Sequence, residues 1–251
     1  NYMSLLMRQF GTAANAEPVI KNSMLPVNNF TFGNHPKAIN ITGQKIKQDH
    51  NTSYHTCKPC SIFCGHKGLF NDKQVSVPEY ETLVLLGTNL GVFDPNDISR
   101  FNEICNQKGM DTISAGGTLA WVMEATQKGL VKTDLEFGST EKIEKALENI
   151  ANLKDFGRQM AMGSRKLSDK FGGKDFAIQV KGLEMAGYDP RGAYGQGLGY
   201  AVANRGACHL SSFPVGFENF LGFLAPDTIR AKHRFVKFFE NIYAALNSLD
   251  I

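Results

Sequence analysis

Three cysteines crowded into eight residues constrain this chain more than any other feature of its sequence. Cys57, Cys60 and Cys64 have the spacing C-x2-C-x3-C, and one tight loop can point their three thiolates inward. Thiolates at these separations can hold several corners of a cubane iron–sulfur cluster. The chain has five cysteines, an odd number, and a secreted disulfide framework rarely crowds three of them together. The motif therefore predicts a bound iron–sulfur cluster in a reducing, cytoplasmic compartment.

Zinc is the alternative occupant of this loop. His55 and His66 flank it and offer nitrogen ligands for a mixed site. Structural zinc usually takes two pairs of ligands, however, and no second Cys or Cys/His pair with finger spacing occurs in the chain. We favour the cluster, which needs a fourth ligand. Of the remaining cysteines, Cys105 is expected to be a small buried side chain on an apolar helix face, and Cys208 lies in a Gly-rich loop.

Composition and charge exclude two classes of partner. The 251 residues are 42% hydrophobic and 20% charged, which is ordinary globular composition and enough for one large domain or two modest ones. The net charge of +3 comes without any Lys/Arg-rich run, so nucleic acid is not an expected partner. The apolar stretches are short and broken by Gly or polar residues, so no membrane-spanning segment is expected.

Apolar periodicity predicts a mainly α-helical chain with Gly-rich loops. The expected helices lie within 1–12 and over 94–109, 114–128, from 140 onward, 156–171 and 226–249. Residues 13–45, rich in Asn, Pro and Gly, are expected to be mostly loop. Periodicity is lost over 172–210, where the run Gly195-x-Gly197-x-Gly199 would let the backbone approach a ligand closely. We expect two helical domains: 1–174, which carries the cysteine motif, and 175–251.

Five motifs in a fixed order resemble the aldehyde:ferredoxin oxidoreductases. They are the loop Cys57–Cys64, Pro78-Glu79-Tyr80-Glu81-Thr82, Gly109-Met110-Asp111-Thr112-Ile113-Ser114, Asp189-Pro190-Arg191-Gly192, and Asn204-Arg205-Gly206-Ala207-Cys208-His209-Leu210. Any one of them is weak evidence, but together they cover essentially the whole chain. That family carries a tungsten (or molybdenum) bis-molybdopterin cofactor beside a [4Fe–4S] cluster. The resemblance implies that the two helical domains match the family's C-terminal domains.

The same resemblance implies that the chain is a fragment. Family members begin with a β-rich domain that covers the pterins, and this chain has no match to it. They carry the fourth cluster cysteine in a D-x-x-G-L-C motif whose counterpart begins at Asn247, so that cysteine is expected just past Ile251. The second domain would then be truncated at its C-terminal end, and the fragment alone is expected to be inactive. Cys208 matches the family's C-H-L loop and not the cluster.

The resemblance also implies roles for individual residues. The reaction would be oxidation of a small aldehyde to a carboxylic acid, with electrons leaving through the cluster to ferredoxin. Glu81 matches the family glutamate near the metal and would act as general base, with Glu79 the less favoured neighbour. His209 matches the histidine beside the substrate and would polarise the aldehyde oxygen. Asp189 begins a tight turn that exposes Arg191, whose guanidinium suits a pterin phosphate or a carboxylate.

Both pterin motifs depart from the family pattern at their first residue. The family sequence is D-x-x-G-L-D/C. Here the first copy starts with Asn106 and continues through Gly109, Met110 and Asp111, and the second starts with Asn247. Compared with the aspartate of the family, an asparagine side chain keeps one oxygen acceptor and gains an NH2 donor, but it carries no charge. We expect these five residues to contact the cofactor through altered hydrogen bonds.

The sequence says less about oligomeric state and leaves alternatives open. Some family members bridge two subunits through an iron held by a Glu and a His. Arg100 falls near that Glu position, and no His occurs between His66 and His209, so this iron is expected to be absent. A homodimer or a separate electron-transfer subunit stays open. So does the choice between tungsten and molybdenum, because pterin sulfurs hold the metal. The rival functions are a benzoyl-CoA-reductase-type catalytic subunit of the same family and an electron-transfer or zinc-structured binding module.

Overall fold

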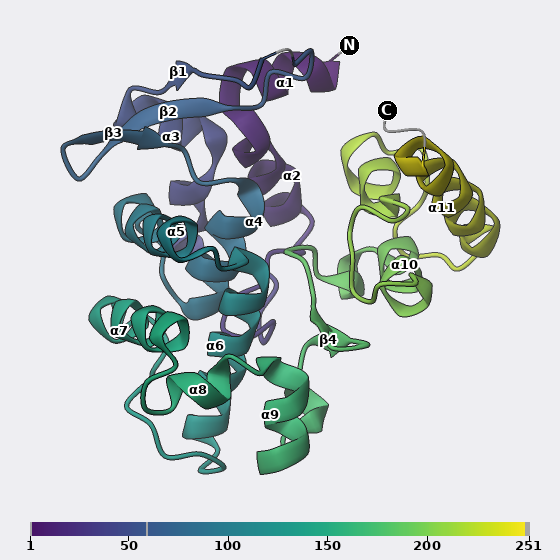
Figure 1. Cartoon of the computed structure of the whole chain (residues 1–251). Coiled ribbons are helices and arrows are strands. Elements are labelled where there is room, and N and C mark those ends of the chain that lie inside the picture. The colour runs from purple at the N-terminus through teal and green to yellow at the C-terminus, as the bar shows by residue number, and fades with distance from the viewer. Residues whose placement is uncertain (1, 59, 249–251) are drawn as a thin grey trace.

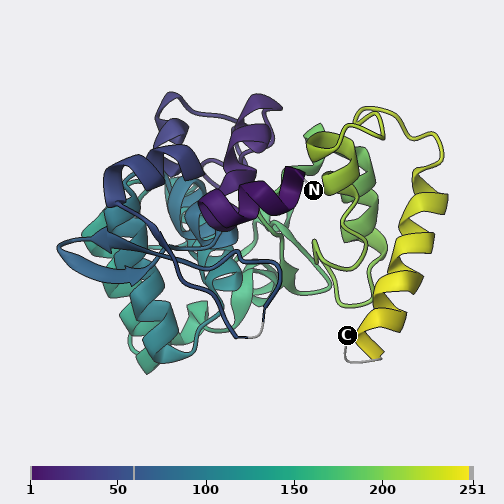
Figure 2. The ribbon, with the colours of Figure 1, turned by 90° about the horizontal axis from the view of Figure 1, so that it is seen from above.

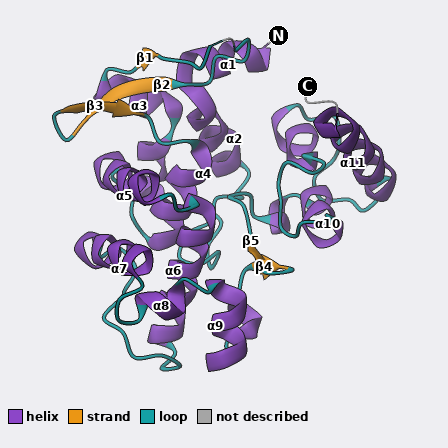
Figure 3. Ribbon diagram, in the orientation of Figure 1, coloured by secondary structure: helices purple, strands orange, loops and turns teal. Residues whose placement is uncertain are grey.

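A computed structural model describes residues 2–58 and 60–248 of the chain. Helices dominate it, which confirms the mainly α-helical prediction (Figure 1, Figure 3). A larger group of elements runs from the N-terminus to α9 (Gly163–Phe171), and a smaller group holds α10 (Tyr194–Val202) and α11 (Lys232–Ser248). Seen from above in Figure 2, the first helix lies across the junction between the two groups. The proposed division into domains at 174/175 stays a prediction.

The N-terminal region is more helical than its composition suggested. Helix α1 (Tyr2–Phe10) ends at Gly11, as predicted, where φ is +63°. The prediction that 13–45 is mostly loop was wrong, because the region contains α2 (Ala16–Lys21), the 3-10 helix η2 (Pro36–Ile41) and the start of α3 (Gly43–His50). Pro36 stands in the first turn of η2, and Thr42 directly precedes α3. The side chain of Thr42 accepts a hydrogen bond from the Lys45 amide.

A small antiparallel sheet, which the sequence analysis missed, fixes both ends of the cysteine loop. Its strands are β1 (Ser53–Tyr54), β2 (His66–Phe70) and β3 (Lys73–Ser76), in that order. Asn71 and Asp72 form the β2–β3 turn with φ of +46° and +62°, the left-handed values that a two-residue hairpin requires. The cysteines lie between β1 and β2, and Tyr54 pairs with His66 across the base of their loop.

The core surrounds an irregular helical run that begins at α4 (Tyr80–Thr82). It continues through the π-helical turn Leu83–Gly87 and the 3-10 turn Thr88–Leu90. Helix α6 (Thr112–Gln127) packs against this run and is buried along most of its length. The two backbones approach closely at Gly116, where a Cβ would lie 2.3 Å from the Leu85 carbonyl oxygen.

The remaining helices largely follow the predicted ranges. Helix α5 (Pro95–Lys108) begins at Asp94, whose side chain accepts a hydrogen bond from the Asn96 amide, and ends at Gly109. The larger group also contains α7 (Thr140–Asn152), α8 (Gly157–Met160) and α9. The hairpin strands β4 (Gln179–Val180) and β5 (Leu183–Glu184) follow α9. Along the part of the chain that the structure describes, no helix combines the length and apolarity that a bilayer crossing requires.

The glycine run expected to approach a ligand is helical instead. Gly195, Gly197 and Gly199 lie in α10, so the predicted loss of regular structure over 172–210 was wrong there. A Cβ on Gly195 would lie 2.6 Å from Glu218, and one on Gly199 would lie 2.8 Å from the Ser212 hydroxyl. These two glycines therefore make room for neighbouring side chains of the protein.

A buried ion pair fastens α11 to α10. The carboxylate of Glu218 accepts hydrogen bonds from the backbone amides of Gly195 (2.7 Å) and Gln196 (3.1 Å) at the start of α10. The same carboxylate binds Lys232 in the first turn of α11, and the ammonium group also donates to the Ala225 carbonyl (2.6 Å). The Glu218 and Lys232 side chains are 0% and 3% exposed, so neither charge has water as an alternative partner.

Removing one charge of this pair should destabilise the fold more than neutralising both charges. We expect Lys232→Met to destabilise the fold by about 3–5 kcal/mol, because it leaves the Glu218 carboxylate buried and unpaired. The double variant Lys232→Met/Glu218→Gln keeps an acceptor for α10 and should recover most of that loss. Urea unfolding of the three proteins checks the prediction, and a double variant no more stable than Lys232→Met would contradict it.

Candidate active site

One cavity brings together the carboxyl and imidazole groups that the sequence singled out. It has a volume of about 300 Å³ and contains Glu79, Glu81 and His209. Its other lining residues come from four parts of the chain: Thr12, Asn15, Tyr80, Tyr188, Leu210 and Phe213. Motifs more than a hundred residues apart in the sequence therefore form one chemical site.

Glu81 lies in the short helix α4 and is held at the wall of the cavity. Its Oε2 atom accepts a hydrogen bond of 2.6 Å from the Gly187 amide, and 15% of its side chain is exposed. Burial raises the pKa of Glu81 to about 8; the Gly187 hydrogen bond opposes this shift, and the nearby charge of Asp111 adds to it. The carboxyl is therefore protonated at neutral pH and loses its proton in the mildly alkaline range.

His209 lies against the free edge of this carboxyl. Its Nε2 atom is 3.5 Å from Oε1 of Glu81, and the Oε1 atom is buried without a hydrogen-bond partner in the described structure. Burial, together with the nearby charge of Arg205, lowers the pKa of His209 to about 4. At neutral pH the site thus holds a neutral imidazole beside a neutral carboxyl group. Such a pair can donate and accept protons without placing a net charge in the cavity.

Aromatic rings form the wall behind the pair. Tyr80 stacks on Tyr188 with ring centroids 4.9 Å apart, and the Tyr80 hydroxyl donates a 2.6 Å hydrogen bond to the Gly187 carbonyl. The Tyr200 hydroxyl donates to the Tyr188 carbonyl at 3.3 Å. Burial raises the pKa of all three tyrosines, so their phenol groups stay neutral. Sequence reasoning assigned no role to these rings, although Tyr80 lies within one of the motifs that it recognised and Tyr188 directly precedes another.

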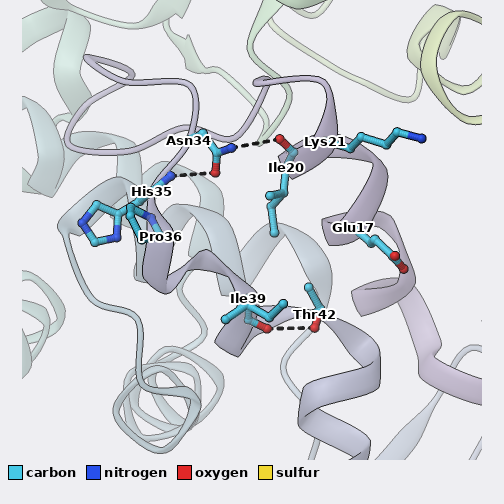
Figure 4. A pocket seen from close by; sticks show the side chains of 8 residues that line it. All are labelled: Glu17, Ile20, Lys21, Asn34, His35, Pro36, Ile39 and Thr42. Atoms are coloured by element: carbon cyan, nitrogen blue, oxygen red, sulfur yellow. Dashed lines mark hydrogen bonds between the residues drawn. The ribbon is translucent and has the colours of Figure 1, made fainter.

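A larger depression lies elsewhere and lacks this chemistry. It has a volume of about 630 Å³ beside η2 (Figure 4). Its polar groups bind one another: Asn34 donates to the Ile20 carbonyl and accepts from the His35 amide, and Thr42 donates to the Ile39 carbonyl. We therefore place the site in the smaller cavity with Glu81 and His209.

The three thiols of the cysteine loop differ in environment. Cys57 is exposed, whereas Cys60 and Cys64 are partly buried, and all three are free. Amide groups of Phe63 and Ile62 lower the pKa of the Cys60 thiol. Burial raises the pKa of the Cys64 thiol, and the negative charge of Glu79 adds to the shift.

One of the two histidines that could complete a zinc site has both ring nitrogens engaged. Within residues 2–58 and 60–248, no three Cys, His, Asp or Glu side chains converge on a point that one metal ion could occupy. His66, the alternative zinc ligand, contacts the Cys64 carbonyl (3.0 Å) and the Arg8 carbonyl (2.9 Å) through its two ring nitrogens. Both nitrogens are thus already engaged.

The first predicted pterin motif forms the turn between α5 and α6. Asn106 is exposed near the end of α5, and Gly109 ends that helix with φ of +67°. Nothing lies within 4 Å of a Cβ built on Gly109, so the outer face of the turn is open to a ligand. Met110 is partly buried, and Asp111 caps α6 by accepting a 2.6 Å hydrogen bond from the Ser114 amide. An open turn with an exposed amide side chain fits a pterin edge.

The other predicted pterin contacts are arranged differently. Asp189 caps a 3-10 turn by accepting from the Arg191 amide (2.9 Å) and also binds the Arg191 guanidinium at 2.5 Å. Arg191 donates to the Phe30 carbonyl as well, so this cation is already paired, although 63% of its side chain is exposed. Asn247 lies near the end of α11, on the side of the molecule opposite α5 (Figure 1). The described residues therefore do not join the two asparagine motifs into one site.

The surroundings of Arg100 and Cys105 indicate that both residues have structural roles. The Arg100 guanidinium pairs with Asp97 and, at 2.7 Å, with Glu144 of α7. The predicted absence of a bridging iron stays a prediction. Cys105 is fully buried, as predicted, and burial raises its pKa to about 12.

Comparison with known proteins gives the family. A family model described as aldehyde ferredoxin oxidoreductase, domains 2 and 3, matches residues 1–251. The chain belongs to the aldehyde ferredoxin oxidoreductase family. It is similar to the tungsten-containing aldehyde ferredoxin oxidoreductase of Pyrococcus furiosus, with 37% identity over 84% of this chain and 36% of the relative. The protein of the same name from Pyrococcus horikoshii is 34% identical over 97% of this chain and 42% of its own length.

A solved structure supports the fold independently. The active-site complex BamBC of benzoyl coenzyme A reductase, bound to 1,5-dienoyl-CoA, superposes with a TM-score of 0.62. It covers 93% of this chain and 38% of that chain at 15% identity, a level that speaks for the fold alone. The chain thus spans about two fifths of these relatives, and the activity of the whole protein is a matter for proposal.

The shifted pKa of Glu81 makes stability depend on pH. Between about pH 4.5 and 8 the folded chain keeps a proton on Glu81 that the unfolded chain has lost, so stability should fall as pH rises through this range. Glu81→Gln removes that dependence. In urea unfolding, the stability of the variant relative to the original chain should increase by on the order of 3–5 kcal/mol between about pH 5 and pH 8.5. If the difference in unfolding free energy between the variant and the original chain is the same at both pH values, the raised pKa of Glu81 is contradicted.

Proposed function

We propose that this chain forms the substrate-binding part of an oxidoreductase that converts a small aldehyde to a carboxylic acid. The observation that carries the proposal is the pair formed by Glu81 and His209 in an aromatic cavity. Family membership supports the reaction class, since the curated relatives are named as tungsten-containing aldehyde ferredoxin oxidoreductases. The balanced reaction takes one aldehyde and one water to one carboxylic acid, two protons and two electrons.

The two electrons need acceptors, and these would be cofactors bound by the protein. A tungsten (or molybdenum) bis-molybdopterin would accept the electron pair, and a [4Fe–4S] cluster would pass the electrons singly to ferredoxin. Cys57, Cys60 and Cys64 would hold three corners of the cluster. The proposed pterin contacts are Asn106, Gly109, Met110, Asp111, Asp189, Arg191 and Asn247. Of these, the open α5–α6 turn fits best, because Asn106 is exposed there.

The residues of the cavity would handle the protons. With a pKa of about 8, Glu81 can release its proton and then remove one from the attacking water or aldehyde hydrate near neutral pH. A neutral His209 can donate its N–H to the aldehyde oxygen and stabilise the charge that develops there. Tyr80 and Tyr188 exclude bulk water, which strengthens both effects because the local dielectric is low.

Aldehyde oxidation by the full-length, metal-loaded protein tests the proposal. Viologen or ferredoxin should become reduced when simple aldehydes are added. Glu81→Gln should lower kcat by about 100-fold or more, because the glutamine cannot accept a proton. Glu141→Gln, the same change on the exposed first turn of α7, is the matched control and should keep full activity. The absence of turnover on any aldehyde would exclude the proposed reaction.

Metal analysis tests the proposed cofactors separately. The full-length protein, grown anaerobically with both metals available, should contain iron together with tungsten or molybdenum. Cys60→Ser should lower the iron content, whereas Cys105→Ala should not, because Cys105 is buried on a helix away from the loop. Zinc without iron would instead favour the zinc-structured alternative.

A further inference from the structure

The cavity of the proposed active site has a solvent-facing side and a closed side. Two of its lining residues, Glu79 and Leu210, are exposed to solvent. Tyr80 and Tyr188, which line the same cavity, are buried. A small molecule that enters from solvent would therefore pass the carboxylate of Glu79 before its body reaches the two rings.

Glu79 supplies the negative charge of the cavity wall. The structure describes every lining residue, and none of them is a lysine or an arginine. The raised pKa of Glu81 and the lowered pKa of His209 leave both of these groups uncharged near neutral pH. Beyond the wall, the negative charge of Asp111 acts on Glu81 and the positive charge of Arg205 acts on His209. These two outer charges oppose each other, whereas no positive group of the wall opposes Glu79.

A hydrogen bond holds the Glu79 carboxylate at this wall. Glu79 directly precedes α4 in an extended conformation, and its side chain makes no capping hydrogen bond to that helix. It accepts instead from the hydroxyl of Thr12, which also lines the cavity and accepts from the Tyr80 amide at 2.9 Å. The negative charge of Glu79 also raises the pKa of the Cys64 thiol, so its field extends beyond its direct contacts.

The proposed reaction changes the charge of the molecule inside this cavity. An aldehyde without other ionisable groups is neutral, whereas the carboxylic acid formed from it is an anion at neutral pH. A fixed carboxylate repels a second anion with an energy that rises as the separation falls. Glu79 would therefore leave the entry of a neutral aldehyde almost unaffected, and it would oppose the binding of any anion.

We propose that Glu79 is a specificity residue that excludes aldehydes bearing a carboxylate or phosphate group and that favours release of the carboxylate product. This role rests on the proposed aldehyde oxidation. The preferred substrates would be neutral aldehydes with an apolar or aromatic body, because Tyr80 and Tyr188 form the closed side of the cavity. Proton transfer stays with Glu81 and His209, so the two neighbouring glutamates would have separate tasks.

Two aldehydes of nearly the same shape but different charge test this role in the full-length holoenzyme. They are 4-formylbenzamide, which is neutral, and 4-formylbenzoate, which is an anion. The original enzyme should show the higher kcat/KM with the amide. In Glu79→Gln, which keeps an acceptor for Thr12, this preference should fall by about 3- to 30-fold, mostly through KM, because the repulsion is lost. Added salt should weaken the preference of the original enzyme and change that of Glu79→Gln much less.

Two further variants separate charge from shape and from location. Glu79→Asp keeps the carboxylate and should keep most of the preference for the amide. Glu141→Gln removes a negative charge from the exposed first turn of α7, outside the cavity, and should leave the preference unchanged. Inhibition by benzoate, the product of benzaldehyde oxidation, is a second readout. Its inhibition constant should be about 3- to 30-fold lower in Glu79→Gln than in the original enzyme.

The outcomes distinguish this role from the proposed function. Failure to oxidise any aldehyde rejects the proposed function and this role with it. If aldehydes are oxidised but the original enzyme does not prefer the amide, or Glu79→Gln keeps the full preference, the selection by Glu79 is rejected. An equal loss in Glu141→Gln also rejects it, because the effect would then reflect overall charge. Equal inhibition of both enzymes by benzoate rejects the role in product release. A preference that falls in Glu79→Gln alone, together with stronger benzoate inhibition, supports both parts.

Discussion

The site depends on how the segment Ala186–Asp189 crosses between the two groups of helices. Residues of the larger group form hydrogen bonds with the backbone of this segment at two of its positions. The Gly187 amide donates to Glu81 and its carbonyl accepts from the Tyr80 hydroxyl, each at 2.6 Å, and the Asp189 amide donates to the Met24 carbonyl at 2.9 Å. A Cβ on Gly187 would come within 3.1 Å of the Glu81 carboxyl, so a side chain there would push against the acid. The crossing therefore positions the acid and closes the cavity around it.

Burial at this crossing also sets the chemistry of the pair. Glu81 and His209 are shifted in opposite directions, and desolvation is the main cause of both shifts. Each group is driven toward its neutral form, and the 3.5 Å separation keeps them in contact without an obligatory ion pair. An ion pair would hold the proton on the imidazole, whereas the neutral arrangement leaves a carboxyl that can exchange a proton near neutral pH. The wall that buries the pair thus shifts both pKa values as well as bounding the cavity.

Sequence alone singled out two residues that one cavity brings together, Glu81 and His209, but it did not predict the shape of that cavity. Motif order identified Glu81 and His209, and apolar periodicity located the longer helices. The aromatic wall was beyond reach, because stacking between Tyr80 and Tyr188 depends on tertiary contacts that no local pattern encodes. The strands around the cysteine loop were missed although Asn71 and Asp72 give a local turn signal. The glycines of α10 led to the wrong prediction that regular structure is lost there. Gly195 and Gly199 are helical and accommodate neighbouring side chains.

The turn after α1 connects the cysteine loop with the acidic side of the cavity. Gly11 lies so close to the loop that a Cβ there would be 2.6 Å from the Cys64 carbonyl oxygen. The next residue, Thr12, lines the cavity, where its hydroxyl donates to Glu79 and accepts from the Tyr80 amide at 2.9 Å. One peptide unit thus separates a contact with a proposed cluster ligand from a contact with the proposed active site. Because the two contacts are one residue apart in the chain, a shift of the cysteine loop at Gly11 would be passed directly to the wall of the cavity at Thr12.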